Sequence, residues 1–143
     1  MFDKQPILAD GTYHLRPLTW DDQPALRAAA ADPLIWAGHP DTDRYKPEVF
    51  DLLFPKLMAF KGAMIVEHDG AVIGTSTYYA GSTQPGTIAI GYSFLTRPYW
   101  GGAANRAVKT LLLEHAFASF GSVWFHIGPE NICLLYTSDA ADD

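Results

Sequence analysis

Residues 87–121 constrain the fold most, because a strand-like run leads through a glycine pair straight into a helix-like run. The run TIAIGYSFL is rich in β-branched and aromatic residues and is followed by RPYWGG. Apolar residues then recur at helical spacing up to Gly121, at Val108, Leu111, Leu112, Ala116 and Phe120. Such a junction of small residues points backbone N–H groups and the positive end of a helix dipole outward. It therefore predicts a seat for a phosphate-bearing ligand.

Three further segments predict strands. Two β-rich runs within residues 63–80 join at Asp69-Gly70, a dipeptide that tolerates positive φ, and predict an antiparallel hairpin. TYHLRPL, residues 12–18, predicts the first strand. SVWFHI, residues 122–127, predicts a buried last strand.

Two helices are predicted between the first strand and the hairpin. The first runs from Asp21, which can cap it, to Asp32, which precedes a proline. The second begins at Pro47, is kinked or divided by Pro55 and is ended by Gly62. The predicted order is β-α-α-β-β-β-α-β, which is an α/β (α+β) fold around a mixed, mostly antiparallel sheet.

Length and charge narrow the function classes. A chain of 143 residues with 48% hydrophobic residues predicts one domain with one core. A net charge of −6 disfavours nucleic acid as a partner, and no apolar stretch is long enough to cross a membrane. Cys133 is the single cysteine, so no internal disulfide forms and a cytoplasmic location is expected. The histidines lack metal-ligand spacing, so no metal is expected, and the sequence sets no oligomeric state.

The order of elements, with a long strand running through a glycine-bearing turn into an amphipathic helix, resembles the GNAT superfamily of acyl-CoA-dependent N-acetyltransferases. The likeness covers residues 10–132. The segments LRPLT, DGAVIGTSTYY, IGYSFLTRPYWGG and LLLEHAF look like the branch that includes the ribosomal-protein N-terminal acetyltransferases. The resemblance implies acetyl-CoA as the co-substrate.

The family signature is Gln or Arg, two residues, Gly, one residue, then Gly or Ala. Trp100, Ala103 and Asn105 occupy these positions here, which departs from the pattern, although the turn keeps its small residues. A turn that binds pyrophosphate through backbone N–H groups needs close approach more than particular side chains. Asn105 could cap the helix or turn its amide to a phosphate, and Arg106 supplies a local positive charge.

The resemblance also implies that the strand before the turn is splayed near Ser93 to Thr96, so that its free backbone groups bind pantetheine and polarise the thioester carbonyl. The expected acetyl-CoA-binding residues are Phe94, Leu95, Thr96, Trp100, Gly101, Gly102, Ala103, Ala104, Asn105, Arg106 and Asn131.

Acetyl transfer needs a neutral amine and an acid for the departing thiolate. Relatives often carry a glutamate before IGY, but Ala89 stands there in this chain. Glu67 and Tyr92 are the catalytic candidates, with His68 and His126 as alternatives. A protein N-terminus, with a pKa of roughly 7.7–8.0, needs little help from a base, so α-amines are favoured over lysine side chains.

The acceptor is expected near the loop between the first two helices, at His39, Arg44 and Tyr45. It is a protein N-terminus or an amine-bearing small molecule. The leading function is therefore acetyl transfer from acetyl-CoA to a primary amine by direct attack in a ternary complex. A catalytically silent CoA-binding or ligand-sensing module is the alternative. A dinucleotide-binding fold is disfavoured, because the turn has no GxGxxG run and follows antiparallel strands.

The end of the chain departs from the family. After GPEN the sequence ICLLYTSDAADD resembles adaptor read-through in metagenomic reading frames, so we expect residues 133–143 to be a non-native tail behind a domain of residues 1–132. The final helix and strand of the family would then be missing, and the strand at residues 122–127 would have an unpaired edge. Tyr136 is accordingly not a candidate for the catalytic acid.

Overall fold

The computed structural model describes residues 2–37, 41–80, 86–127 and 132–137, the backbone alone being described from residue 126 onward. In these residues seven strands form one sheet in the order of the chain, β1 to β7. The strands are β1 (Leu8–Ala9), β2 (Tyr13–Pro17), β3 (Ala63–His68), β4 (Ala71–Tyr79), β5 (Thr87–Leu95), β6 (Ser122–Ile127) and β7 (Ile132–Thr137). All neighbouring strands are antiparallel except β5 and β6. The predicted α/β fold with a mixed, mostly antiparallel sheet is confirmed.

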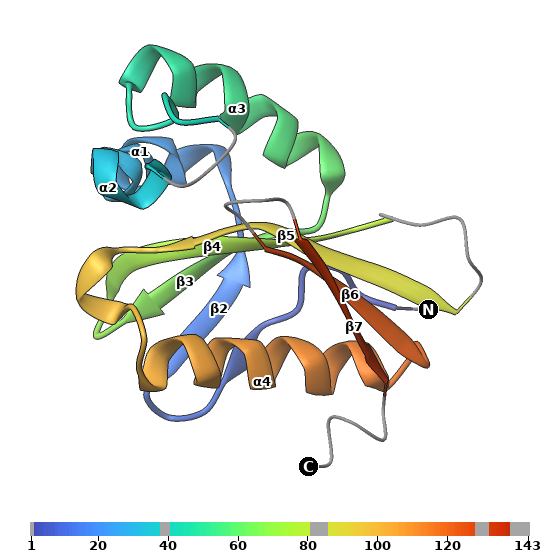
Figure 1. Ribbon diagram of the computed structural model, residues 1–143. Helices are drawn as coiled ribbons and strands as arrows, with labels where there is room; N and C mark the ends of the chain where they lie inside the picture. The colour runs from blue at the N-terminus through green and yellow to red at the C-terminus, as the bar shows by residue number, and fades with distance from the viewer. Residues whose placement is uncertain (1, 38–40, 81–85, 128–131, 138–143) are drawn as a thin grey trace.

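Helices cover both faces of this sheet (Figure 1). The helices of one face are α1 (Gln23–Ala30), α2 (Pro33–Trp36) and α3 (Pro47–Phe60), and α4 (Ala103–Phe117) lies on the other. Two 3₁₀ turns complete the elements, η1 (Trp20–Asp22) before α1 and η2 (Arg97–Tyr99) between β5 and α4. Because α4 connects two parallel strands, it has to cross the sheet from the end of β5 to the start of β6.

The sheet separates two hydrophobic cores. On the α4 face, Tyr78 and Ile90 pack with Val108 and Leu112 of the helix. On the α1–α3 face, Ile65 packs with residues of all three helices, which are Leu26, Ala30, Trp36, Phe50, Phe54 and Leu57. Alternate residues of a strand point to opposite faces. Each central strand therefore contributes to both cores, and this explains the long apolar runs in the sequence.

The predicted hairpin is confirmed: β3 and β4 are antiparallel, and both turn residues have positive φ, 51° at Asp69 and 79° at Gly70. The second predicted helix is a single element, α3, with Pro55 inside it. Phe50, Phe54 and Leu57 are all buried in the same core, which holds the parts before and after the proline on one side. The helix ends at Phe60, and its C-cap is Lys61, which has a left-handed φ of 54° and directly precedes the predicted Gly62.

Apart from the two 3₁₀ turns, three of the described elements lie outside the predicted order. Strand β1 and helix α2 have two and four residues, which is too short for a periodic signal. The third is β7, which pairs antiparallel with β6. The expected unpaired edge of β6 is therefore wrong, because the β-prone run ICLLYT takes the place beside it. The predicted domain boundary after residue 132 stays a prediction.

The first residues of the chain are bound to the domain at both faces. The ring of Phe2 packs against those of Tyr78 and Phe120, at 5.2 and 4.9 Å between centroids. Lys4 Nζ donates to the carbonyl oxygen of Phe60 at 3.0 Å. This hydrogen bond gives a partner to a carbonyl at the C-terminal end of α3. We call residues 2–5 the N-terminal strap.

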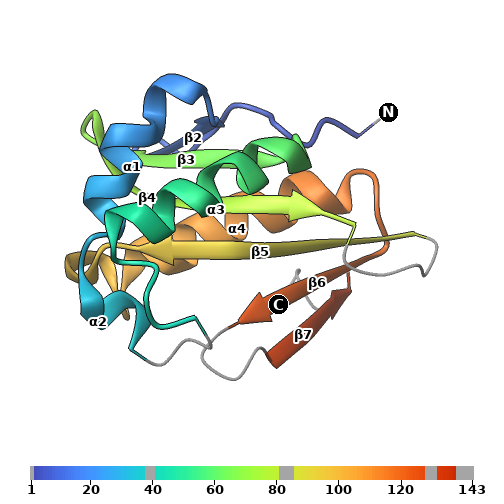
Figure 2. The ribbon, with the colours of Figure 1, turned by 90° about the horizontal axis from the view of Figure 1, so that it is seen from above.

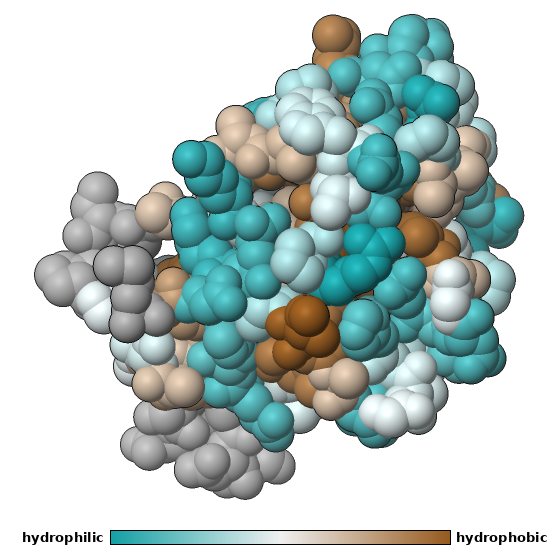
Figure 3. All heavy atoms as spheres, turned by 180° about the vertical axis from the view of Figure 1, so that it is seen from behind, coloured by the Kyte–Doolittle hydropathy of each residue, from teal (hydrophilic) through white to brown (hydrophobic). Residues whose placement is uncertain are grey.

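The surface seen from behind is mostly hydrophilic, with apolar residues exposed in small separate groups (Figure 3). In the described part of the chain no helix is long and apolar enough to span a membrane. Scattered exposed apolar side chains of this kind are ordinary for a folded domain and do not mark a binding site. The candidate site is therefore described from the sheet and its turns.

Candidate functional site

The parallel strands β5 and β6 separate in the middle of the sheet. Thr87–Ile90 pairs with Ser122–Phe125. Beyond these pairs β5 continues to Leu95 and β6 to Ile127, and the described residues of the two strands form no further pair. Figure 2 shows β5 and β6 moving apart toward their C-terminal ends. The predicted splay is therefore present and begins after Ile90, earlier than the expected Ser93. Along this stretch, backbone groups of β5 that face β6 can bind a ligand.

A β-bulge lies at the same level of β5. Thr75 pairs with Phe94 and Thr77 with Gly91, so the single residue Ser76 faces two residues of β5. One of these two, Tyr92, has a φ of 50°, which costs an L-residue roughly 1–2 kcal/mol. The hydroxyls of Ser76 and Ser93 are 2.7 Å apart and fasten the bulge. Bulges bend a strand and redirect its side chains, and this one turns β5 at the point where β6 leaves it.

The glycine turn before α4 has unoccupied backbone donors. Gly101 has a φ of 66°, and a Cβ at this position would have no atom within 4 Å, while at Gly102 the nearest atom is 3.8 Å away. Among the described residues, no hydrogen bond is found for the amides of residues 101–105. Gly102 is the N-cap of α4, so the alternative that Asn105 caps the helix is wrong. Asn105 and Arg106 are exposed beside these amides and are available to a phosphate.

Trp100 lies at the entrance to this turn without filling it. Its indole Nε1 donates to the carbonyl oxygen of Leu95 at 2.7 Å, and the side chain is half exposed. The indole is therefore held against the end of β5, and it consumes one carbonyl there while the glycine amides stay open.

Two contacts hold the turn from either side. Arg97 Nε donates to Asp32 at the N-terminus of α2, and this hydrogen bond lowers the pKa of the Asp32 carboxyl. On the other side, Nδ1 of His68 is 2.9 Å from the hydroxyl of Tyr99. The glycine turn is thus tied both to the helices of the α1–α3 face and to the β3–β4 hairpin.

The predicted acceptor residue Arg44 and the predicted catalytic residue Tyr92 lie together on the α1–α3 face. The guanidinium of Arg44 is 5.7 Å from the ring centres of both Trp36 and Tyr92, and it binds Asp41 at 2.8 Å. Lys56 Nζ is 5.2 Å from the same Tyr92 ring. The loop that was expected to admit the acceptor therefore reaches the bulge.

The remaining predicted residues are distributed as follows. Phe94 and Tyr45 pack against the core of the α1–α3 face, and Leu95 packs against the core on the other side. Thr96 donates its backbone N–H to the carbonyl of Ile73 at 2.8 Å. Within the turn, Ala103 is exposed and Ala104 is buried. His39 and Asn131 lie outside the described residues, as does the side chain of His126.

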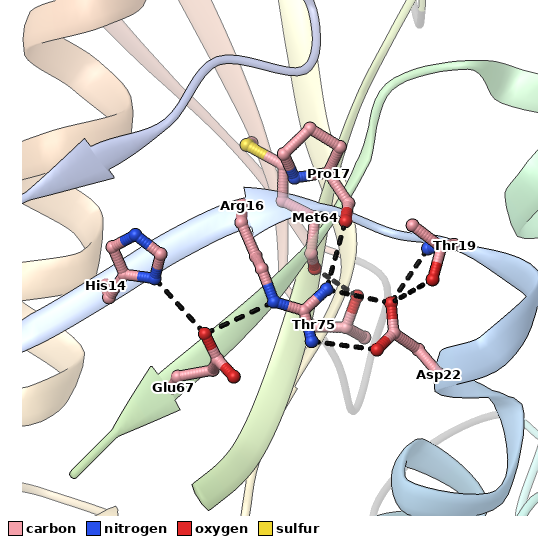
Figure 4. Close-up of polar contacts among 8 residues, drawn as sticks. All are labelled: His14, Arg16, Pro17, Thr19, Asp22, Met64, Glu67 and Thr75. Atoms are coloured by element: carbon pink, nitrogen blue, oxygen red, sulfur yellow. Dashed lines mark hydrogen bonds and ion pairs between the residues drawn. The ribbon is translucent and has the colours of Figure 1, made fainter. Parts of the chain in front are cut away.

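Glu67 lies away from the splay, in a closed ionic cluster on β2 and β3 (Figure 4). Its Oε1 accepts from His14 Nδ1 at 3.1 Å and from Arg16 Nε at 3.2 Å. Arg16 also binds both carboxylate oxygens of Asp22, at 2.8 and 2.9 Å. Burial would raise the pKa of Asp22, but hydrogen bonds from Arg16 and Thr19 outweigh it and hold the pKa below its ordinary value. The catalytic prediction thus has Tyr92 at the splay and Glu67 two strands away.

Sequence reasoning missed the residues around Ala89. Strand register places Tyr79 of β4 and Trp124 of β6 directly beside Ala89, and neighbouring pairs of this kind share one face. The adjacent row, Tyr78, Ile90 and Phe125, belongs to the core of the α4 face. Tyr79, Ala89 and Trp124 therefore face α1–α3, on the same side as Tyr92. The signal available in the sequence was the alternation of β4, once its pairing with β5 was known.

Comparison with known proteins identifies this arrangement. The profile of the acetyltransferase (GNAT) domain matches residues 13–133. A search of curated proteins finds no significant match.

Three solved structures illustrate the similarity of fold. A GCN5-related N-acetyltransferase from Brucella melitensis aligns with a TM-score of 0.70 and 17% identity over 84% of this chain and 59% of its own. Mycobacterium smegmatis RimJ in complex with CoA-disulfide aligns with a TM-score of 0.70 and 18% identity over 92% and 72%. Ribosomal-protein-S5-alanine acetyltransferase from Vibrio fischeri aligns with a TM-score of 0.65 and 14% identity over 85% and 73%. At these identities the likeness concerns the fold, and this chain spans less than two thirds of the Brucella protein.

Proposed function

The chain belongs to the GNAT acetyltransferase family, and we propose that it transfers an acetyl group from acetyl-CoA to a primary amine by direct attack in a ternary complex. The observation that carries the proposal is the splay of β5 and β6, followed along the chain by a glycine turn whose amides have no partner among the described residues. A long thioester carrier with a diphosphate at one end fits both features. The co-substrate is therefore placed by backbone groups more than by side chains.

In this proposal the diphosphate binds the amides of residues 101–105 at the positive end of α4, and Arg106 adds a charge. The pantetheine lies along the edge of β5 that faces the splay. A backbone N–H of that edge stabilises the oxyanion that forms on the thioester carbonyl. Because the donors are fixed by the fold, they need no rearrangement as the charge develops.

The acceptor approaches from the α1–α3 face, where Arg44 and Tyr92 lie. With alanine at position 89, an amine that is partly neutral near pH 8 is the best substrate, which favours an α-amine. Two structures of similar fold are those of ribosomal-protein acetyltransferases, one for protein L7/L12 and one for S5. This supports a protein N-terminus as the first acceptor to test, with small amines as the second.

The substitution Gly102→Asp tests the proposed seat of the diphosphate. A side chain at Gly102 has room, and aspartate is a favoured N-cap, so the variant should keep or gain a few tenths of a kcal/mol of stability. The added carboxylate should repel the diphosphate and weaken CoA binding at least tenfold in calorimetry. Thr110→Asp, at an exposed position farther along α4, adds the same charge and should leave binding within twofold. Equal affinity in both variants would contradict the proposed seat.

A catalytically silent CoA-binding module is the second candidate, favoured by Ala89. Release of free thiol from acetyl-CoA in the presence of an N-terminal peptide, a polyamine or an aminoglycoside separates the two. Thiol release with any acceptor supports the transferase, whereas CoA binding without thiol release across the panel supports the silent module.

A further inference from the structure

A tyrosine is the strand neighbour of the alanine at position 89, and its hydroxyl lies over Gly91. Tyr79 is the direct cross-strand neighbour of Ala89 and points to the same face. Its ring lies over Gly91: a Cβ added to Gly91 would be 2.8 Å from the Tyr79 hydroxyl oxygen and 2.9 Å from a ring carbon. Gly91 must therefore stay a glycine for the hydroxyl to lie there. Gly91 is also the first residue of β5 beyond its last pair with β6, so the hydroxyl is at the origin of the splay.

The ring of Tyr79 is held in this position by two aromatic neighbours. Its centroid is 5.4 Å from that of Phe60 in α3 and 5.6 Å from that of Tyr92 in the bulge. Contacts at both spacings restrict the two rotatable bonds of the side chain. The hydroxyl is consequently directed by packing toward Gly91.

Two hydrogen-bonding groups without partners belong to strand neighbours of the same stretch of β5. Among the described residues, Thr77 Oγ1 and Trp124 Nε1 are the buried side-chain polar atoms that lack a hydrogen bond. Thr77 is fully buried and pairs with Gly91, and Trp124 pairs with Ala89. Leaving a buried donor unsatisfied costs about 1–3 kcal/mol. The two residues flank β5 on the α1–α3 face, on either side of Ala89 and Gly91.

We propose that Tyr79 is a catalytic residue of this site, whose hydroxyl passes a proton from the attacking amine to the departing thiolate. The inference rests on the proposed acetyl transfer. It gives a residue of β4 the proton-transfer role, since position 89 holds an alanine and no carboxylate.

The atoms balance without another reactant. The nitrogen of the neutral amine forms a bond to the thioester carbonyl carbon, and the C–S bond breaks with its electron pair on sulfur. The hydroxyl of Tyr79 gives its proton to the sulfur, and the resulting phenolate takes the proton that the nitrogen loses as the amide forms. The products are the amide and the free thiol of CoA, and the hydroxyl is restored.

The test compares Tyr79→Phe with Tyr78→Phe in the full chain, with acetyl-CoA and an acceptor peptide. The adjacent Tyr78 points to the opposite face, where its hydroxyl donates to the carbonyl oxygen of Leu112 in α4. Tyr79→Phe should lower kcat about 100-fold, the lower range for general acid–base catalysis, with KM for acetyl-CoA within twofold. Tyr78→Phe should lower the melting temperature and leave kcat per folded molecule within twofold.

The pH profile distinguishes a proton-transfer role from a structural one. Because an ionised tyrosine cannot donate, kcat of the unsubstituted chain should fall at alkaline pH, and Tyr79→Phe should remove that fall. A kcat within threefold of the unsubstituted chain, or an unchanged alkaline limb, overturns the inference while leaving the proposed transferase intact. Absence of thiol release by the unsubstituted chain with every acceptor overturns both.

Discussion

Two polar clusters lie on the α1–α3 face of the sheet and differ in how their hydrogen bonds are completed. Around Arg16, on β2 and β3, the carboxylates of Asp22 and Glu67 are bound by the same guanidinium. Around Ala89, on β4 to β6, two buried donors, Thr77 Oγ1 and Trp124 Nε1, have no partner among the described residues. The first cluster is complete within the protein, whereas the second leaves hydrogen-bonding capacity unused among the described residues.

The difference separates groups that stabilise the fold from groups available to a substrate. A carboxylate oxygen that already accepts hydrogen bonds from a guanidinium and an imidazole is engaged within the fold. This is the position of Glu67. A hydroxyl or indole N–H without a partner keeps its full capacity to bind. Charge in the sequence is therefore a poorer guide to the site than unsatisfied hydrogen bonding in the structure.

The largest change in stability is expected when the complete cluster around Arg16 is broken. Arg16→Met leaves Asp22 and Glu67 without their cation, and breaking such a pair is strongly destabilising when it is fully buried. Since the Arg16 side chain is 28% exposed, we expect a loss of about 2 kcal/mol in the free energy of unfolding by urea. The kcat per folded molecule should stay within twofold. A large loss of kcat at unchanged stability would restore Glu67 as a catalytic candidate and erase the contrast.

A smaller effect should appear as a pH dependence of the same cluster. The pKa of Asp22 is lowered in the fold, so its contribution to stability is present above the unfolded value of about 3.9 and is lost as pH falls through the folded pKa. The difference in unfolding free energy between the unsubstituted chain and Arg16→Met should therefore be full at pH 6 and shrink below about pH 4. A difference that stays constant down to pH 3 would mean that the carboxylates do not carry it.

The smallest effect concerns the incomplete cluster and has the opposite sign. Thr77→Val replaces an unpartnered hydroxyl by a methyl group of similar size, so stability should rise by about 0.5 kcal/mol. The matched variant is Thr75→Val on the same strand, where the hydroxyl donates to the Met64 carbonyl at 2.6 Å. It should lose about 1 kcal/mol in the same urea titration. A loss in both variants would show that Thr77 is bonded within the protein.

Much of the fold could be predicted from the sequence, because its long elements carry strong local signals. The hairpin at Asp69-Gly70 requires positive φ, and the β-prone run of β5 and the apolar stripe of α4 each lie in an element of nine residues or more. Short elements were not predicted, because they carry too few residues for a local signal; α2, with four residues, is an example. The pairing of β7 with β6 also escaped, since a β-prone hexamer carries no information about its neighbour.

The site was predictable only where it depends on the backbone. Small residues at Gly101 and Gly102 indicated open amides, and the structure places no partner on them among the described residues. The side-chain chemistry depends on register: which residue stands opposite Ala89 follows from the hairpin between β4 and β5 and its bulge, and no local pattern encodes it. Tyr79 could not be told from any half-buried strand tyrosine before that register was known.

The N-terminal strap has a practical consequence for producing the protein. Phe2 lies between rings of both the sheet and the segment after α4, and His115 Nε2 is 2.7 Å from the carbonyl oxygen of Asp3. Clipping by a contaminating protease after residue 5 would remove these contacts. Any shortened version of the chain should therefore retain residues 2–5.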